Sequence, residues 1–153
     1  MRLSIVASLT LLAAAGAIAA PLSQKAALKI IHERHEGMEA VGTTNKILRR
    51  ELGGDTPNLV AIRSAANSMA GIADKSSRWF PKGTGPDVGK TGAKQEIWQN
   101  PDDFAAKRRA FQAAAGALDR AARMGNITTI KESYAELGKT CKGCHDLYRE
   151  EDH

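Results

Sequence analysis

The sequence predicts an all-α protein that folds as an antiparallel four-helix bundle. Beyond residue 20 the chain is rich in alanine, and its β-branched residues do not alternate with polar residues over any strand-length run. Apolar residues recur instead at spacings of three and four in four separate segments, which is the pattern of helices buried on one face. Because mostly short turn sequences separate these segments, consecutive helices should pack side by side in opposite directions.

The first two helices are bounded by recognisable end signals. We expect the first helix over residues 22–52, with Ser23 as its cap and Gly53-Gly54 at its end. Thr56-Pro57 then supplies a cap and an N1 proline for a second helix, which should end before residue 79. The inward face of the first helix is expected to comprise Leu28, Ile31, His35, Met38, Val41, Asn45 and Leu48.

The third helix follows the longest irregular stretch of the chain. Residues 82–95 are rich in glycine and contain Pro86, so they should form a loop. The pair Asn100-Pro101 predicts the start of the third helix, because asparagine can cap it and proline suits its first position. We expect this helix to end at about Met124, with Gly125 after it. Its inward residues should be Phe104, Arg108, Phe111, Ala115, Leu118 and Ala122.

The fourth helix carries the clearest apolar seam. It should begin at Asn126, and the spacing of its apolar residues alternates between three and four, as in a packed bundle. The seam consists of Ile127, Ile130, Tyr134, Leu137, Cys141, Cys144 and Tyr148. The two cysteines therefore continue the face that points into the bundle.

These cysteines are the only two in the chain, and they belong to the motif Cys141-Lys142-Gly143-Cys144-His145. Two thiols at this spacing can add across the two vinyl groups of haem, and the adjacent imidazole can ligate the iron. On a helix with 3.6 residues per turn, all three side chains fall within an arc of about 100°. The motif thus predicts one covalent haem c in the core of the bundle. Any second axial ligand must come from far upstream, because only eight residues follow His145.

The first helix offers the residues for the opposite face of the haem. Met38 is a candidate sixth ligand, because its thioether sulfur is a soft donor that stabilises ferrous haem. The alternative is that Met38 packs as an apolar cover over an open iron face. His35 is expected near the haem edge and is also a candidate ligand, while Arg34 either pairs with a propionate or is an ordinary surface charge.

The N-terminus predicts export. Residues 3–19 are apolar but short, and they end in the cleavage signal Ala17-Ile18-Ala19, so residues 1–19 are expected to be a signal peptide rather than a retained anchor helix. Residues 20–153 would then be one periplasmic domain with no stable membrane span. The full chain has 22 Lys and Arg against 17 Asp and Glu. Since Arg2 is the only charge in the leader, the mature domain would carry +4, and its basic residues lack the interleaved aromatics of a nucleic-acid surface.

The mature chain resembles the cytochrome c′ family, including its six-coordinate, low-spin relatives. The segments that carry the resemblance are Arg34-x-x-x-Met38, Phe80-Pro81-Lys82-Gly83-Thr84, Ile97-Trp98 ahead of Asp103-Phe104, and residues 141–149. The resemblance implies that Cys141 and Cys144 hold the haem, that His145 is the proximal ligand and that Met38 lies over the distal face. It further implies that Arg34 lies near the propionates, that Arg149 lies beside the proximal imidazole, and that two copies can pair through their first helices.

Two functions from different classes remain open at this point. The first is a non-enzymatic one-electron carrier, in which His145 and Met38 both ligate the iron and redox proteins are the partners. The second is a five-coordinate haem protein that binds a diatomic gas, nitric oxide, for scavenging or sensing. A third reading, a redox-active dithiol at Cys141 and Cys144, is disfavoured because such motifs follow a strand and no strand is expected here.

Overall fold

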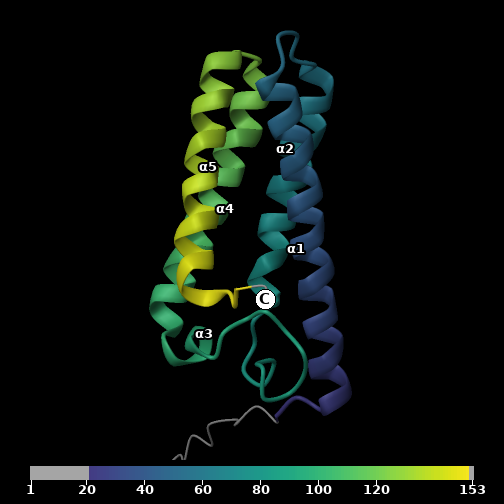
Figure 1. The fold of residues 1–153 in the computed structure, drawn as a ribbon, viewed down its shortest axis with the longest axis vertical. Coiled ribbons are helices and arrows are strands. Elements are labelled where there is room, and N and C mark those ends of the chain that lie inside the picture. The colour runs from purple at the N-terminus through teal and green to yellow at the C-terminus, as the bar shows by residue number, and fades with distance from the viewer. Residues whose placement is uncertain (1–20, 152–153) are drawn as a thin grey trace, which may run out of the picture.

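The computed structural model describes residues 21–151 and confirms the all-α bundle (Figure 1). The four long helices are α1 (Gln24–Gly53), α2 (Leu59–Lys75), α4 (Pro101–Met124) and α5 (Ile127–Tyr148). A 3-10 turn, η1 (Ser76–Arg78), follows α2, and a single helical turn, α3 (Glu96–Gln99), precedes α4. The expected signal peptide at residues 1–19 lies outside the described residues. Among the helices within 21–151, none has both the length and the apolar character to cross a membrane.

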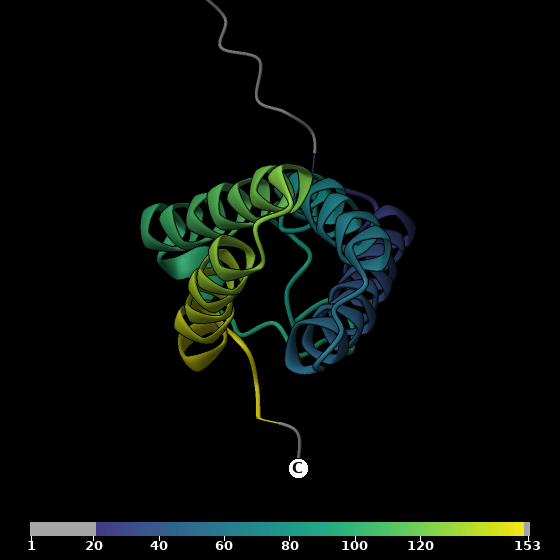
Figure 2. The same cartoon turned by 90° about the horizontal axis from the view of Figure 1, so that it is seen from above.

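The helices pack in the order of the chain, and one side of the bundle stays open. α1 packs on α2, α2 on α4 and α4 on α5, whereas α1 and α5 make hardly any direct contact. Seen from above, the four helices curve around a central region with α1 and α5 facing each other across it (Figure 2). One hydrogen bond spans this side, from Tyr134 Oη to Asn45 Oδ1 at 2.7 Å.

Most helix ends follow the sequence signals. Ser23 caps α1 by accepting a hydrogen bond from the Ala26 N–H, and Gly125 ends α4 in the left-handed conformation, at φ 81°. The start expected for α2 at Thr56-Pro57 is wrong. The cap is Asn58, whose carboxamide oxygen accepts from the N–H groups of Val60 and Ala61, so one side chain satisfies two free donors at the helix start.

The buried face of α1 also differs from the expected stripe. Its buried residues are Ala27, Ile31, Arg34, Thr44, Leu48 and Leu52. Leu28, His35, Met38 and Asn45 are exposed instead. The side chain of His35 is 71% exposed and pairs with Glu39. The inward orientation expected for His35 is therefore wrong. The reason is that α1 buries itself against α2 and the 79–91 loop rather than against α5.

The interior divides into two clusters along the bundle axis. The larger is almost entirely aliphatic, with Leu48, Ile62, Leu118, Ile130 and Leu137 at its centre. The smaller cluster lies at the other end, where α3, α4 and α5 meet, and is mostly aromatic. Its residues are Ala93, Ile97, Phe104 and Tyr148, with Phe80, Trp98 and Cys144 packed against them.

Candidate functional site

Cys141, Cys144 and His145 lie in the last turns of α5, beside the aromatic cluster. Both cysteines are reduced and half-buried. Burial raises the pKa of both thiols, so they are neutral near pH 7. His145 is exposed on the helix surface, but partial desolvation lowers its pKa, and the neighbouring Arg149 lowers it further, while Asp146 opposes them. His145 is therefore kept as the neutral imidazole, the form that ligates a metal.

Met38 lies at the same level of the bundle as the cysteines. The hydrogen bond from Tyr134 to Asn45 fixes the register between the antiparallel helices α5 and α1. Met38 precedes Asn45 by seven residues, and Cys141 follows Tyr134 by seven. Seven residues are nearly two helical turns and about 10 Å, so both side chains keep their faces and move toward the same end. Met38, at 36% exposure, thus faces the open side across from Cys141.

Arg34, one turn before Met38, is not a surface charge. Its side chain is buried, at 3% exposure, and its guanidinium donates four hydrogen bonds. Nη1 donates to Trp79 O (2.9 Å) and Thr84 Oγ1 (3.3 Å), and Nη2 donates to Thr84 O and Thr91 Oγ1 (both 2.9 Å). The guanidinium carbon also lies 5.0 Å from the centre of the Phe80 ring. Arg34 therefore holds α1 and the long loop together.

This buried charge has neutral acceptors but no carboxylate partner among the described residues. Desolvation lowers the pKa of Arg34 to about 10, so the group stays charged near pH 7. A buried cation is costly without an anion, because the interior screens and solvates charge poorly. An anion bound beside the Arg34 guanidinium, one turn from Met38, would therefore stabilise this site.

The loop that Arg34 holds also binds the end of α5. Lys94 N–H donates to Tyr148 O at 3.0 Å, and Glu150 N–H donates to Gly92 O at 2.8 Å, around an isolated bridge between Ala93 and Arg149. Trp79 of the same loop packs on α1 so closely that a Cβ at Gly37 would collide with its ring. The loop thus connects the helix that carries Met38 to the helix that carries His145.

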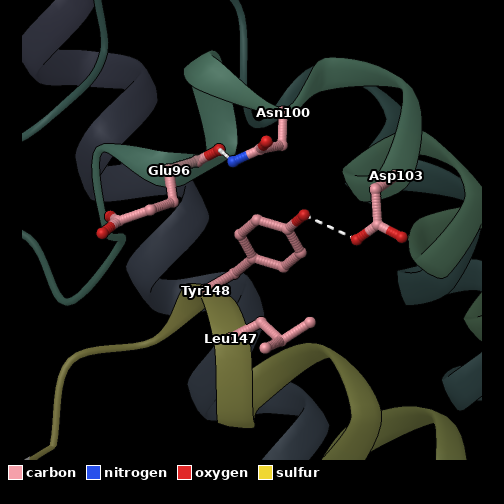
Figure 3. A pocket seen from close by; sticks show the side chains of 5 residues that line it. All are labelled: Glu96, Asn100, Asp103, Leu147 and Tyr148. Atoms are coloured by element: carbon pink, nitrogen blue, oxygen red, sulfur yellow. Dashed lines mark hydrogen bonds between the residues drawn. The ribbon is translucent and has the colours of Figure 1, made fainter.

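Aromatic side chains close the site on the side of α4. Phe80 and Phe104 meet edge to face with centroids 4.7 Å apart, and Phe104 meets Tyr148 at 5.2 Å. Tyr148 Oη donates to Asp103 Oδ2 at 2.6 Å, as Figure 3 shows. This bond raises the pKa of Tyr148 to about 12. The sequence alone does not predict this pairing of Asp103 with α5, because it depends on tertiary packing.

The side chains described above fit a covalently bound haem that α5 would hold on one side and α1 would face on the other. α5 presents two thiols and a neutral imidazole, α1 presents a thioether at the same level, and Arg34 lacks an anion that a haem propionate carries. Arg149 is close enough to His145 for its positive charge to lower the pKa of the imidazole. No group of three or more His, Cys, Asp or Glu side chains within 21–151 is arranged to hold a metal ion by itself.

Comparison with known proteins finds similar sequences and similar folds. The family model described as cytochrome c′ matches residues 29–149. A cytochrome c′ of Allochromatium vinosum is 34% identical over 139 residues, covering 89% of this chain and 88% of the relative. The crystal structure of cytochrome c′ from Thermochromatium tepidum superposes with a TM-score of 0.75 at 32% identity, covering 86% of this chain and all of that one. A further structure, described as a cytochrome c′ with ligand-controlled dimer dissociation, superposes with a TM-score of 0.75 at 30% identity over 86% of this chain and all of that one.

Proposed function

Because the chain belongs to the cytochrome c′ family, whose members carry covalently bound haem c, we propose that it is a periplasmic one-electron carrier with two protein ligands on the iron. His145 would be the proximal ligand and Met38 the distal one. The haem, when bound, supplies a reversible one-electron iron couple. The observation that carries the proposal is the register of α1 and α5, which brings the Met38 thioether level with Cys141.

Each cysteine would anchor the group without any change in oxidation state. Cys141 and Cys144 would hold the haem through two thioether bonds, each thiol supplying its sulfur to one vinyl group and its hydrogen to the neighbouring carbon. His145 would hold the iron, and as a neutral imidazole it would need no deprotonation to do so. Its neighbour Arg149 disfavours the imidazolium and so favours the ligating form.

Arg34 would supply the charge partner for a haem propionate. Its terminal nitrogens already bond Trp79, Thr84 and Thr91, so the guanidinium is fixed before any anion arrives. These bonds use all four terminal N–H groups, so the Nε–H is the donor left for a propionate. The charge of the preorganised cation would attract the carboxylate at little further entropic cost. Because Arg34 also holds the loop, a propionate on this residue would further stabilise the packing of the loop on α1.

The ligation of Met38 is tested by spectra of the holoprotein in both oxidation states. We expect a low-spin spectrum in each state and a sulfur-to-iron charge-transfer band in the oxidised form. Met38→Ala should abolish the band and lower the reduction potential, because thioether ligation favours ferrous iron. The matched control is Met124→Ala, which removes an exposed methionine at the far end of α4 and should leave the spectrum unchanged. High-spin spectra in the wild type, with rapid binding of carbon monoxide or nitric oxide to the ferrous form, would support the gas-binding alternative and end this proposal.

The periplasmic location rests on residues 1–19 as a cleaved leader. Expression with the cytochrome c maturation machinery should give a periplasmic holoprotein whose N-terminus is Ala20. Mass spectrometry of the purified protein checks both the cleavage site and the mass of one covalent haem. A protein that keeps residues 1–19 would contradict this assignment.

Homodimer formation is the last part of the proposal. The relative with ligand-controlled dimer dissociation shares the bundle, and here α1 exposes Leu28 on the same helix that carries Met38. We propose that two copies pair through α1. Sedimentation of the holoprotein should show a dimer that Leu28→Glu dissociates, and a monomer at all concentrations would contradict the pairing.

A further inference from the structure

A second concave site lies on the outer side of the aromatic cluster, between the end of α2 and the start of α4. Its floor is apolar, formed by Phe80, Ile97, Trp98 and Phe104, and it holds about 190 Å³. Its rim carries two cations, Lys82 and Arg108. No acidic residue lines it, and within residues 21–151 neither cation forms an ion pair. We call this feature the cationic pocket.

The neighbouring pocket has the opposite charge. It holds about 280 Å³ and is lined by Glu96, Asn100, Asp103, Leu147 and Tyr148 (Figure 3). Both pockets border the start of α4, so a cationic and an acidic patch lie side by side at the loop end of the bundle. A partner that meets both patches is held in one orientation, because rotating it would bring like charges together.

The floor of the cationic pocket leads directly to the cysteine-bearing helix. Phe80 contacts Phe104 at 4.7 Å, and Phe104 contacts Tyr148 at 5.2 Å. Cys144 packs against this same cluster. A molecule seated in the pocket is thus separated from Cys144 by little more than one layer of aromatic side chains.

We propose that the cationic pocket is the docking site for an acidic electron-transfer protein. A carboxylate of the partner binds between Lys82 and Arg108, and apolar atoms beside it cover Phe80 and Trp98. Arginine and aromatic residues are the side chains that dominate binding at interfaces, and a small, charge-steered contact suits a redox encounter. The inference rests on the proposed function, because it assigns the surface through which the carrier meets its partner.

The test uses the holoprotein and a redox-inert anion as a substitute for the partner's carboxylates. Paramagnetic hexacyanochromate(III) is titrated at low ionic strength, and line broadening is measured against diamagnetic hexacyanocobaltate(III), which has the same charge. The reporter is the indole N–H of Trp98, which lines the pocket and donates to Pro81 O at 3.0 Å. We expect Trp98 to broaden strongly and the buried Trp79 to broaden less.

The variant Lys82→Glu/Arg108→Glu should reduce the broadening of Trp98 roughly five-fold, because both steering charges are reversed. The matched control Lys46→Glu/Arg120→Glu changes the net charge equally, but Arg120 lies about 18 Å further along α4 than Arg108. This control should keep the wild-type broadening. Broadening that is absent at Trp98, or that falls equally in both variants, would overturn the docking site.

Oxidation kinetics provide the second measurement. With hexacyanoferrate(III) as oxidant, the reduced Lys82→Glu/Arg108→Glu protein should react several-fold more slowly than the control variant. With the cationic oxidant tris(phenanthroline)cobalt(III), it should not be slower. Equal rates for the two variants with the anionic oxidant would overturn the docking site. If the iron proves five-coordinate, the carrier function fails, whereas the broadening still decides the docking site because it requires no electron transfer.

Discussion

The two ends of the bundle have cores made of different kinds of side chain. The end next to the turns at residues 54–58 and 125–126, here the closed half, is filled by aliphatic side chains such as Leu48, Ile62 and Leu118, all of them fully buried. The other end, here the loop half, contains residues 79–95 and the termini of the described chain (Figure 1). It is filled by aromatic rings, a buried arginine and two half-buried thiols. The same four helices thus form one complete core and one incomplete one.

This difference between the two cores indicates which part of the bundle a cofactor would stabilise. In the closed half, helix seams meet, and among residues 21–151 no charged side chain is buried there. In the loop half, α1 and α5 stay apart, and Arg34 is buried with neutral partners only. A region that buries a charge without a counter-ion is poorly stabilised on its own, because desolvation of the charge is not compensated. The loop half is therefore the part that haem binding should stabilise most.

Removing both thiols should produce the largest effect, and it should act on the loop half rather than on the closed half. Cys141→Ala/Cys144→Ala, made with the maturation machinery, should contain no covalent haem by the pyridine haemochrome assay. Because ligand binding stabilises the folded form, hydrogen exchange should accelerate in residues 79–95 and in the last turns of α5. The closed half should stay protected. Equal acceleration throughout the chain would show that the two halves do not differ in this way.

A cavity in the closed half should destabilise the protein without touching the haem. Leu118→Ala removes a fully buried side chain, and we expect a loss of about 3 kcal/mol in the free energy of unfolding. Urea unfolding of the holoprotein measures it, and the visible spectrum should stay that of the wild type. The control Val60→Ala, on the exposed face of α2, should change stability by less than about 0.5 kcal/mol. A changed spectrum in Leu118→Ala would mean that the halves are coupled.

Breaking the contact between Arg34 and the loop should cost somewhat less and act on the loop half. Arg34→Gln leaves the carbonyls of Trp79 and Thr84 without their donors, and we expect a loss of about 2 kcal/mol. Arg34→Lys keeps the charge but loses the planar guanidinium with its several donors. Its unfolding free energy should therefore lie between those of the wild type and Arg34→Gln. Arg49→Gln, an exposed arginine of α1, is the control. If Arg34→Gln matches this control in urea unfolding, Arg34 does not hold the loop.

The smallest effect concerns the bond between Tyr148 and Asp103. Tyr148→Phe should cost about 1 kcal/mol near neutral pH, the usual net value of one hydrogen bond. The folded state holds the Tyr148 proton up to a pKa of about 12, whereas an unfolded tyrosine loses it near pH 10. The stabilisation from Tyr148 is therefore constant below pH 10 and declines as pH rises toward 12.

Tyr148→Phe should reduce that alkaline decline in unfolding free energy, and Asp103→Asn should lower the pKa of Tyr148 toward 10. Ultraviolet titration of the folded protein measures this pKa. An unchanged titration in Asp103→Asn would show that another group sets it.

Sequence reasoning worked where the evidence was local. The seam of α5, the cap at Ser23 and the end of α4 at Gly125 depend on neighbours a few residues away, and each was confirmed. It failed on the face of α1, because the choice between His35 and Arg34 depends on which elements cover that helix. Spacing places both residues near the apolar stripe, and only the loop contacts select Arg34.

Local patterns in the sequence were enough to predict the fold class, most of the helix ends and the haem motif, because hydrophobic period, capping and thiol spacing act along the chain. Three features emerge only from the packing of the helices and the loop: α1 and α5 stay apart, Met38 lies level with Cys141, and Arg34 is buried with no anionic partner among the described residues. These features depend on contacts between residues 40 to 90 positions apart. No local pattern encodes such contacts, because each one depends on how whole helices and a loop pack against one another.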